Sequence, residues 1–397
     1  MGLFRRVSTR RLVSFLAAAV LAAVAAGIAV AASGGSGSPP PAKALPDAVH
    51  DALTAPPLEG VSGTLIFTNR LLGAGALASG GSSPLAGGAS GRFWVTAGGH
   101  ARLELQSADG SGDVQLLYDG SSVELYDGAS NTVYRAQLPQ AAGDQSGSAS
   151  QTPPTVAQIQ NGLDKLAGAF TISGATPTTV ADQGAYLVRL SPKTNGGLFG
   201  AAEVAWDALH GVPLRLAVYA VGDSTPVLEL TATQIAYGPV SPLDVQIALP
   251  SDVHVVDLGT IGGGSSDAGS AAAPVTGVAA VAAQLPFALV APDSLAGQSR
   301  TEVRLVQLDG SPAALVTYGQ GLGSVALLEG QQKAHAGGGS GLLAGLPSVS
   351  LASSVSGTEL ATALGTVVRF DKGGVAYTVA ASQPTSTVVD AARSIAG

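Results

Sequence analysis

The side chains that most often perform catalysis or hold metals are sparse and scattered in this sequence. Cysteine is absent, which excludes disulfides, thiolate metal sites and a cysteine nucleophile. The five histidines are His50, His100, His210, His254 and His335. No two of them lie at the i, i+4 spacing of a zinc-binding helix, so we interpret each as a surface or turn histidine. The sequence predicts no catalytic residue and no metal ligand.

Two glycine-rich turns resemble known binding motifs but lack the context of those motifs. Residues 319–323 (Gly-Gln-Gly-Leu-Gly) are predicted to join two strands, whereas a phosphate loop opens a helix. Residues 109–113 (Asp-Gly-Ser-Gly-Asp) lack the later glutamate of a calcium loop. The spacing along the chain does not exclude a serine–histidine–aspartate triad, because the members of a triad come together only in the folded protein. However, no Gly-x-Ser-x-Gly elbow joins a predicted strand to a predicted helix. We therefore expect no enzyme and no cofactor; a hydrolase ranks third among the functions considered.

The strongest pattern is instead a run of short strands that predicts an antiparallel meander. Asp119-Gly120 and Asp127-Gly128 each follow a tyrosine and an apolar-alternating run, which is a strong hairpin signal. Ala101, Leu103 and Leu105 alternate with polar residues, so the sheet should have one apolar face and one polar face. The predicted strands cover residues 92–97, 100–107, 113–118, 121–126 and 131–138.

Helices and further strands are predicted around this meander. A helix at 45–53 has Pro46 in its first turn, and a second at 156–170 starts near Thr155 and carries one apolar stripe. Further strands are predicted at 61–69, 185–190, 203–206, 212–219, 227–237 and 244–249. The stripe predicts that the second helix covers the concave, apolar side of an incomplete barrel.

The first 42 residues predict export. Four arginines at positions 5, 6, 10 and 11 precede an uncharged stretch at 12–32, and a Gly/Ser/Pro segment follows it. The stretch is long enough to span a bilayer, and residues 29–31 (Ala-Val-Ala) offer a cleavage site. A cleaved signal peptide and a retained membrane anchor are therefore both open. The positive charge before the stretch places the rest of the chain outside the membrane in either case.

Composition bounds the partners and the domains of the exported portion. Without those 4 arginines, 15 of the 19 Lys and Arg remain against 27 Asp and Glu, which gives a net charge of −12. Nucleic acid and anionic membrane surfaces are therefore excluded as electrostatic partners. A Gly/Ser/Ala linker at 257–274 is predicted to separate a domain at 45–256 from one at 275–397.

The C-terminal part is predicted to be a small α+β domain. Its predicted helices cover 276–284 and 358–364, and a closing helix begins at 386. Its predicted strands cover 302–308, 313–318, 324–328, 367–370 and 376–380.

Several motifs of the larger domain resemble the LolA-like proteins. They are Trp206-Asp207, Gly-Val-Pro-Leu-Arg-Leu at 211–216, the runs 228–237 and 247–250, and the Tyr-Asp hairpins at 117–127 with Asn-Thr-Val-Tyr-Arg at 131–135. The resemblance covers roughly 47–258. It implies a mainly β fold with α: an incomplete antiparallel barrel closed by helices, as in lipoprotein carriers, RseB-type periplasmic sensors and mycobacterial LppX-like lipid binders.

The C-terminal part departs from the RseB pattern. Residues 287–292 and 318–323 look more like a domain that follows such units in actinobacterial envelope proteins. The chain also has no cysteine for the lipid anchor of LppX-like lipoproteins. The order of a LolA-like domain followed by a smaller domain still resembles RseB.

Two functions are expected from these patterns. The first is an extracytoplasmic carrier or sensor of a lipid or lipoprotein acyl chain, because a chain of about 14 carbons gains on the order of 10 kcal/mol on burial. The second is an RseB-like regulatory protein that binds an anti-sigma factor or another envelope protein. For the first, each predicted cavity residue could instead belong to a filled core. The predicted cavity residues are Leu65, Phe67, Leu103, Leu105, Val114, Leu116, Leu125, Leu163, Leu166 and Leu214.

Overall fold

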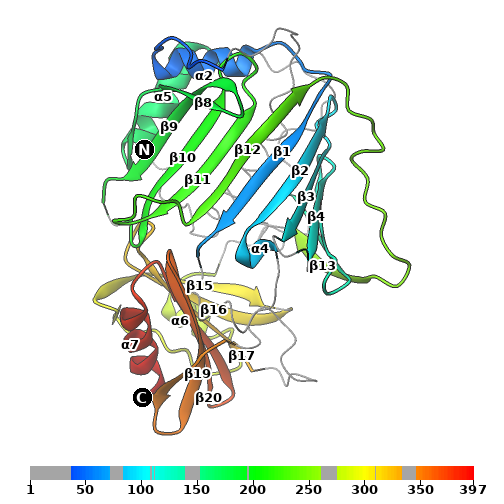
Figure 1. Ribbon diagram of the computed structural model, residues 1–397. Coiled ribbons are helices and arrows are strands. Elements are labelled where there is room, and N and C mark those ends of the chain that lie inside the picture. The colour runs from blue at the N-terminus through cyan, green and yellow to red at the C-terminus, as the bar shows by residue number, and fades with distance from the viewer. Residues whose placement is uncertain are drawn as a thin grey trace.

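The computed structural model describes residues 37–71, 84–107, 110, 112–138, 153–194, 196–260, 275–308, 310–332 and 346–397. These residues form two sheets, a larger one of 13 strands and a smaller one of eight (Figure 1). The predicted export segment at 12–32 and most of the predicted linker lie outside the described residues. Among the described helices, none is long and apolar enough to cross a bilayer.

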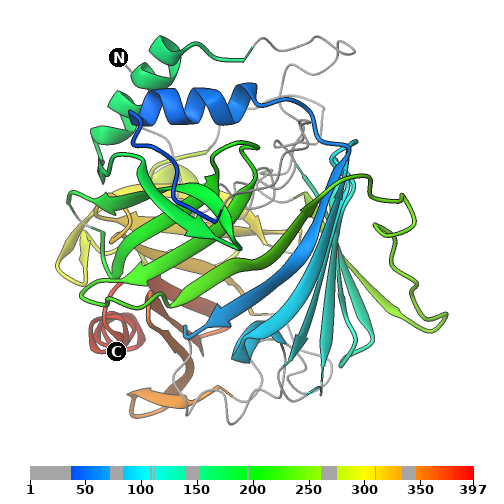
Figure 2. The same cartoon turned by 45° about the horizontal axis from the view of Figure 1, so that its top comes forward.

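The larger sheet contains the predicted meander as β2 to β6, with β1 beside it. In spatial order its strands are β13 (His254–Thr260), β6 (Thr132–Gln137), β5 (Ser122–Asp127), β4 (Asp113–Tyr118), β3 (Ala101–Ser107), β2 (Ala89–Thr96), β1 (Gly60–Asn69), β12 (Leu228–Tyr237), β11 (Pro213–Ala220), β10 (Phe199–Asp207), β9 (Gln183–Pro192) and β7 (Phe170–Ile172), with β8 (Thr176–Val180) also on β9. All neighbours are antiparallel except β13, which pairs with β6 in parallel. The sheet is curled and open (Figure 2).

The strand predicted at 244–249 is wrong. Those residues form turns and irregular structure. After β12, the chain next forms a strand of this sheet at β13. The reason is a crossing: the backbone carbonyl of Asp244 accepts from Arg102 Nη1 on β3 at 3.3 Å, and Val245 is buried. The segment thus passes over β3 instead of extending the ladder beside β12, and it reaches the far edge of the sheet.

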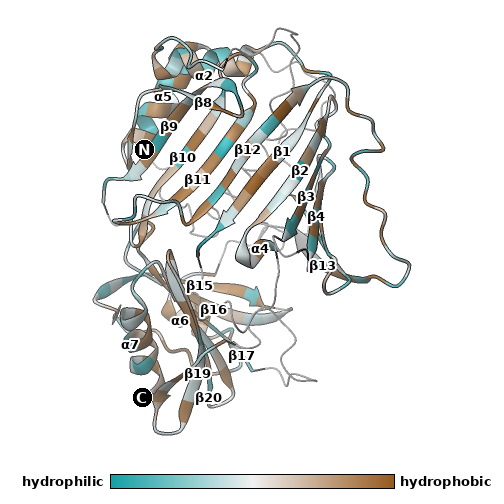
Figure 3. Ribbon diagram, viewed as in Figure 1, coloured by the Kyte–Doolittle hydropathy of each residue, from teal (hydrophilic) through white to brown (hydrophobic). Residues whose placement is uncertain are grey.

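Strand pairing sorts the side chains of the larger sheet onto two faces. Leu65 on β1 stands in the same cross-strand row as Leu105 on β3 and Val114 on β4. We call their face the helix face, since α2 packs on its far half. The opposite face carries Arg92 and Glu104, and we call it the charged face. Figure 3 shows hydrophobic and hydrophilic residues alternating along β9 to β12.

The two helices of the larger sheet lie together at one end of it (Figure 2). α2 (Leu45–Thr54) packs Ala48 against Tyr186 and Trp206 of β9 and β10. α5 (Val156–Ala167) begins, as predicted, at Thr155, which forms a capping box with Gln158. Its main contacts are with α2 and β7, so the prediction that it covers the meander is wrong. A short third helix, α4 (Pro84–Gly87), contacts β1, β3 and β4.

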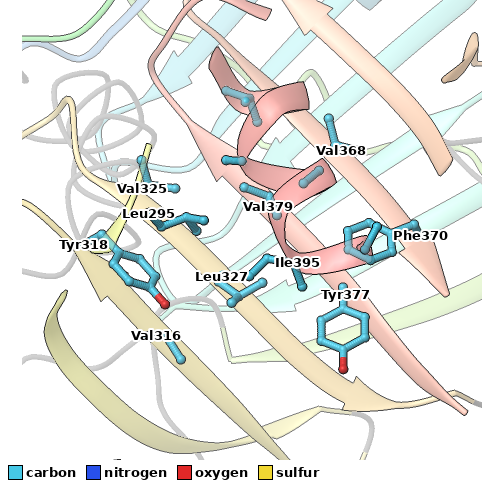
Figure 4. Close-up of a cluster of buried hydrophobic side chains, with 14 of the residues drawn as sticks. Leu295, Val316, Tyr318, Val325, Leu327, Val368, Phe370, Tyr377, Val379 and Ile395 are labelled. Carbon is cyan, nitrogen blue, oxygen red and sulfur yellow. The ribbon is translucent and has the colours of Figure 1, made fainter. Parts of the chain in front are cut away.

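The smaller sheet is covered on one face by a helix. Its strands in spatial order are β14 (Ser294–Leu295), β15 (Gln298–Leu308), β16 (Ser311–Tyr318), β17 (Val325–Gln331), β21 (Val375–Ala381), β20 (Gly365–Lys372), β19 (Val355–Thr362) and β18 (Ser348–Ala352). The closing helix α7 (Thr385–Ala396) packs on this sheet, and α6 (Val278–Ala282) contacts β15. Val281 of α6 belongs to the same apolar core as the side chains of α7. Figure 4 shows Ile395 of α7 in this core beside side chains of the strands.

The helix predicted at 358–364 is wrong, because β19 occupies these residues. The run Thr-Glu-Leu-Ala-Thr-Ala-Leu suits a helix locally. In the fold, β19 is paired on both sides, with β18 and β20, so its backbone groups are satisfied by neighbouring strands. Tertiary pairing therefore overrides the local preference. The overall fold class, mainly β with helices on an incomplete antiparallel barrel, is confirmed.

Candidate functional site

Six of the ten predicted cavity residues lie together on the helix face. Leu65, Leu105 and Val114 are buried, and three others pack against them while remaining half-buried. We call this group the meander cluster. Its members are Leu65, Phe67, Ala89, Phe93, Leu103, Leu105, Val114, Leu125 and Leu230. Leu116 stands opposite both Leu103 and Leu125, so it belongs to the same face and is also half-buried.

The other three predicted cavity residues lie elsewhere. Leu214 is buried in a second cluster, with Leu58 and Val61. Leu163 is half-buried on α5, and Leu166 on the same helix is 44% exposed. Because α5 rests on α2 and β7, the structure does not bring these two leucines to the meander cluster. A role in ligand contact stays a prediction for all ten residues.

The turn between β10 and β11 anchors α2 on the helix face. Gly211 in this turn has φ +68°, and a Cβ there would lie 2.4 Å from the carbonyl oxygen of Ala52 in α2. Only glycine allows both that backbone angle and that approach. Trp206, just before the turn, packs against Ala48. The Trp206-Asp207 and 211–216 motifs thus hold the covering helix in place.

Asp207, His210 and Tyr237 form a buried polar cluster under this turn. Asp207 is 1% exposed and His210 is 4% exposed. The Asp207 carboxylate accepts from the backbone N–H groups of Leu209 and His210 and from the Tyr237 hydroxyl, and His210 Nδ1 lies 3.1 Å from it. The His210 ring stacks on Tyr237 at 3.9 Å between centroids. His210 lies in a turn, as predicted, but it is buried.

The pKa shifts in this cluster indicate that Asp207 is a charged hydrogen-bond acceptor that holds the turn together. Burial acts to raise the pKa of Asp207, but the hydrogen bonds from His210 and Tyr237 hold that pKa below its usual value. Burial and the nearby Asp207 charge raise the pKa of Tyr237. The carboxylate is therefore ionised and already occupied by four donors. This arrangement fixes the turn and leaves little acceptor capacity for a proton transfer to a substrate.

The charged face carries a network of ion pairs that the sequence analysis missed. Glu203 on β10 accepts from Arg189 at 2.7 Å, from Arg215 at 2.7 Å and from the Tyr219 hydroxyl at 2.7 Å. Arg215 also pairs with Glu229 at 2.6 Å. Arginine and glutamate in successive strands are a sequence signal for such cross-strand pairs, but the sequence alone does not say which strands are neighbours. They became visible only once the strand order was known.

A second network lies on the same face over the meander. Arg92 pairs with Glu104 at 2.9 Å, and Arg102 bonds to Glu104 and to Gln115 Oε1. An open hollow of about 700 Å³ lies beside them, lined mainly by polar groups such as Thr64, Arg92, Glu104, Asp113, Gln115 and Thr233. Leu65 and Leu105 border it as well. This hollow is on the charged face, whereas the sequence analysis placed a cavity on the apolar face.

The described residues contain no cluster of three or more histidine, cysteine or acidic side chains that could hold a metal ion. The two faces of the larger sheet differ in the groups that they present. The helix face offers half-buried apolar side chains, and the charged face offers internally compensated ion pairs.

No family model matches the chain, and no curated protein matches it. Among solved structures, the chain is similar to MucB in complex with MucA(peri), at 16% identity and a TM-score of 0.39, and to the MucA/MucB complex of Pseudomonas aeruginosa, at 14% identity and a TM-score of 0.40. Both alignments cover 88% of this chain and 94% of the other. A Vibrio parahaemolyticus structure described as an outer membrane lipoprotein-sorting protein domain matches at 10% identity and a TM-score of 0.20, over 47% of this chain and 89% of the other.

The two MucB matches extend over most of this chain, whereas the lipoprotein-sorting domain matches about half of it. At such identities and TM-scores, no function and no residue role carries over from them to this chain.

Proposed function

We propose that this protein is an extracytoplasmic binding protein that holds an acyl chain against the meander cluster, as a carrier or sensor without catalysis. The observation that carries the proposal is a cross-strand row of half-buried apolar side chains on the helix face, with Phe67 half-buried on the same face. The row consists of Phe93, Leu103, Leu116 and Leu125. Each presents apolar surface to the side of the sheet on which α2 lies. An acyl chain laid along this row would remove that surface from water.

The energetics suit this ligand class. Burial of a methylene contributes about 0.8 kcal/mol, so an acyl chain gains affinity from contact area alone and needs no charged partner. The Arg92–Glu104 pair and the Glu203 network lie on the opposite face, where they do not compete with an apolar ligand.

A second candidate is a regulatory protein that binds an envelope partner, such as an anti-sigma factor. It is favoured by direct contacts between the two sheets. The N–H of Leu198, in the β9–β10 hairpin, donates to Ser382 of the smaller unit at 3.1 Å, and the N–H of Ala363 donates to the carbonyl of Leu71 at 2.9 Å. A change at the larger sheet could therefore reach the smaller unit, which would then carry the partner surface.

Two neighbouring leucines provide a matched test of the binding proposal. Leu116 and Leu117 are consecutive on β4, so their side chains lie on opposite faces. With dansyl-undecanoic acid as the fluorescent probe, L116W should weaken binding by about tenfold or more, since loss of 1.4 kcal/mol of contact is tenfold. L117W should bind within about twofold of the unmodified chain.

Lipid extraction of the purified exported portion, followed by mass spectrometry, gives an independent reading. Co-purified lipid or probe uptake supports the carrier or sensor. If neither is found, or if L116W and L117W bind the probe equally, the proposal fails. Thermal unfolding of both variants controls for misfolding.

A further inference from the structure

Glu329 is the most unusual side chain in the smaller unit. It lies on β17 between Leu328 and Gly330, shares its face with Leu327 and Val325, and is 0% exposed. Both of those neighbours belong to the apolar core shown in Figure 4. Glutamate is almost never fully buried unless it is paired. A reason is therefore needed for a carboxyl at this position.

The Glu329 carboxyl has one hydrogen bond. Its Oε2 accepts from the backbone N–H of Val290 at 2.9 Å, and its Oε1 has no hydrogen-bond partner among the described residues. Burial raises the pKa of Glu329 to about 7, and only the Val290 hydrogen bond acts in the opposite direction. The carboxyl thus carries a proton in mildly acidic solution and loses it near neutral pH.

The ionisable groups around Glu329 do not neutralise it. Tyr318 on β16 is fully buried, its hydroxyl has no partner among the described residues, and burial together with the Glu329 charge raises its pKa to about 12. Tyr377 on β21 stands opposite Glu329, and its pKa is also raised. Arg300 on β15 pairs with Asp293 at 2.7 Å. The charged residues of α7, Asp390 and Arg393, pair with each other at the surface.

Val290 belongs to an irregular segment, residues 284–293, that we call the strap. It joins α6 to β14 and lays alternate side chains, including Leu285, Phe287 and Leu289, on the apolar core. Its C-terminal end is tied down, since Arg300 bonds to the Ala291 carbonyl and pairs with Asp293. Among the described residues, Val290 to Glu329 is the hydrogen bond that holds residues 286–290.

We propose that Glu329 and the strap form a proton-controlled latch: the strap is closed over the core while Glu329 carries its proton, and it opens when that proton is lost to water. An ionised carboxylate in this core has one donor and no counter-charge, so it gains by reaching solvent. The strap lies over it and is held there by the apolar packing of its side chains and, at residues 286–290, by one hydrogen bond among the described residues. Opening uncovers the apolar surface beneath Phe287 and Leu289, with Ala291 to Asp293 as the fixed end.

Hydrogen exchange of the strap amides in the full chain, followed by mass spectrometry and corrected for intrinsic exchange, tests the latch. The pKa of Glu329 is about 7 while the strap is closed and returns to its ordinary value when the strap is open. The equilibrium between the closed and open strap therefore depends on pH. The open fraction should rise about tenfold per pH unit between pH 5 and pH 7, then level off, roughly 300-fold in all. The variant E329Q, which cannot ionise, should show no such slope.

A matched control is E302Q on β15, which removes an exposed carboxyl paired with Arg304 and should keep the slope of the unmodified chain. A flat response in the unmodified chain, or an equal slope in E329Q, overturns the latch. Infrared difference spectroscopy of the unmodified chain needs no variant to fold. It should show one protonated carboxyl lost near pH 7, and a midpoint below pH 5.5 for every carboxyl overturns the proposal.

Discussion

The carboxyls of Glu203 and Glu329 both leave water when the chain folds, but the two sheets surround them differently. Glu203 on the larger sheet is 12% exposed and receives hydrogen bonds from two arginines and a tyrosine. Glu329 on the smaller sheet is fully buried and receives one bond from a backbone N–H. The larger sheet surrounds Glu203, like the buried Asp207, with several donors, whereas the smaller unit leaves a single carboxyl in its core with one donor.

This difference gives the two sheets opposite responses to pH. Burial alone would raise the pKa of Glu203, but Arg215, Tyr219 and Arg189 hold it below its ordinary value. A carboxyl with a lowered pKa stabilises the fold above its ordinary range, and that contribution is lost as pH falls through the folded-state pKa. Glu329 has a raised pKa, so its contribution is present below pH 4.5 and is lost as pH rises to about 7. Charge in a fold is thus stabilising or destabilising according to its partners.

The largest effect on this comparison is expected from removing Arg215, the partner that Glu203 shares with Glu229. Arg215→Met leaves the carboxylates of Glu203 and Glu229 without their shared cation on a poorly hydrated face. Loss of one partner from such a pair costs about 3 kcal/mol. Urea unfolding at pH 7 measures it, and Arg393→Met, at a surface pair, is the control. A loss below about 1 kcal/mol would show that the network contributes little.

In the second test, which concerns the smaller unit, removing a charge is expected to raise the free energy of unfolding. Replacing Glu329 by Gln removes the ionisation that the core disfavours, so the variant should gain about 3 kcal/mol over the unmodified chain at pH 8 and nothing at pH 4.5. Urea unfolding of both proteins at the two pH values measures the gain. Equal stability differences at pH 4.5 and pH 8 would contradict the lone-carboxyl account.

The two sheets also hold their covering helices differently, which gives a third test. α7 buries six side chains, whereas α2 buries only Ala48 and relies on the close approach at Gly211. Gly211→Ala should cost about 2 kcal/mol, from the positive φ and from the contact with Ala52. Gly222→Ala is the matched control, since Gly222 has φ +83° but no atom within 4 Å of an added Cβ. Equal losses in thermal unfolding would mean that the contact with α2 adds nothing.

The smallest effect is expected at the surface of α7. Asp390 and Arg393 form an exposed pair at 2.8 Å. Because water and salt screen such pairs, Arg393→Ala should change the free energy of unfolding by only about 0.3 kcal/mol. Urea unfolding at low and high salt measures this change. A loss near that of Arg215→Met would contradict the view that burial and multiple partners set the strength of the Glu203 network.

Local sequence signals located most of the elements. The Asp-Gly turns at 119–120 and 127–128 set the hairpins of β4, β5 and β6, and the Thr155–Gln158 pair set the start of α5. The predictions failed where distant partners decide. Residues 358–364 became a strand because two neighbours pair with them, and residues 244–249 stayed irregular because they cross β3.

The candidate site shows the same division. Alternation in the sequence placed Leu65, Leu103, Leu105, Val114, Leu116 and Leu125 on one face, since strand geometry fixes a period of two. It gave no position for α5, because an apolar stripe does not say which surface it meets. His210 was expected at the surface or in a turn, and its burial depends on Asp207 and Tyr237.

The sequence alone determined the local turns, the helix cap and the two-sided character of the strands, because each depends on residues within a few positions of one another. Only the tertiary structure decided which charges meet on the charged face, that α5 rests on α2 and β7, and that Glu329 lies in an apolar core. Burial and pairing depend on segments far apart in the chain. The free energy of a charged group is therefore fixed only when the strand order is complete.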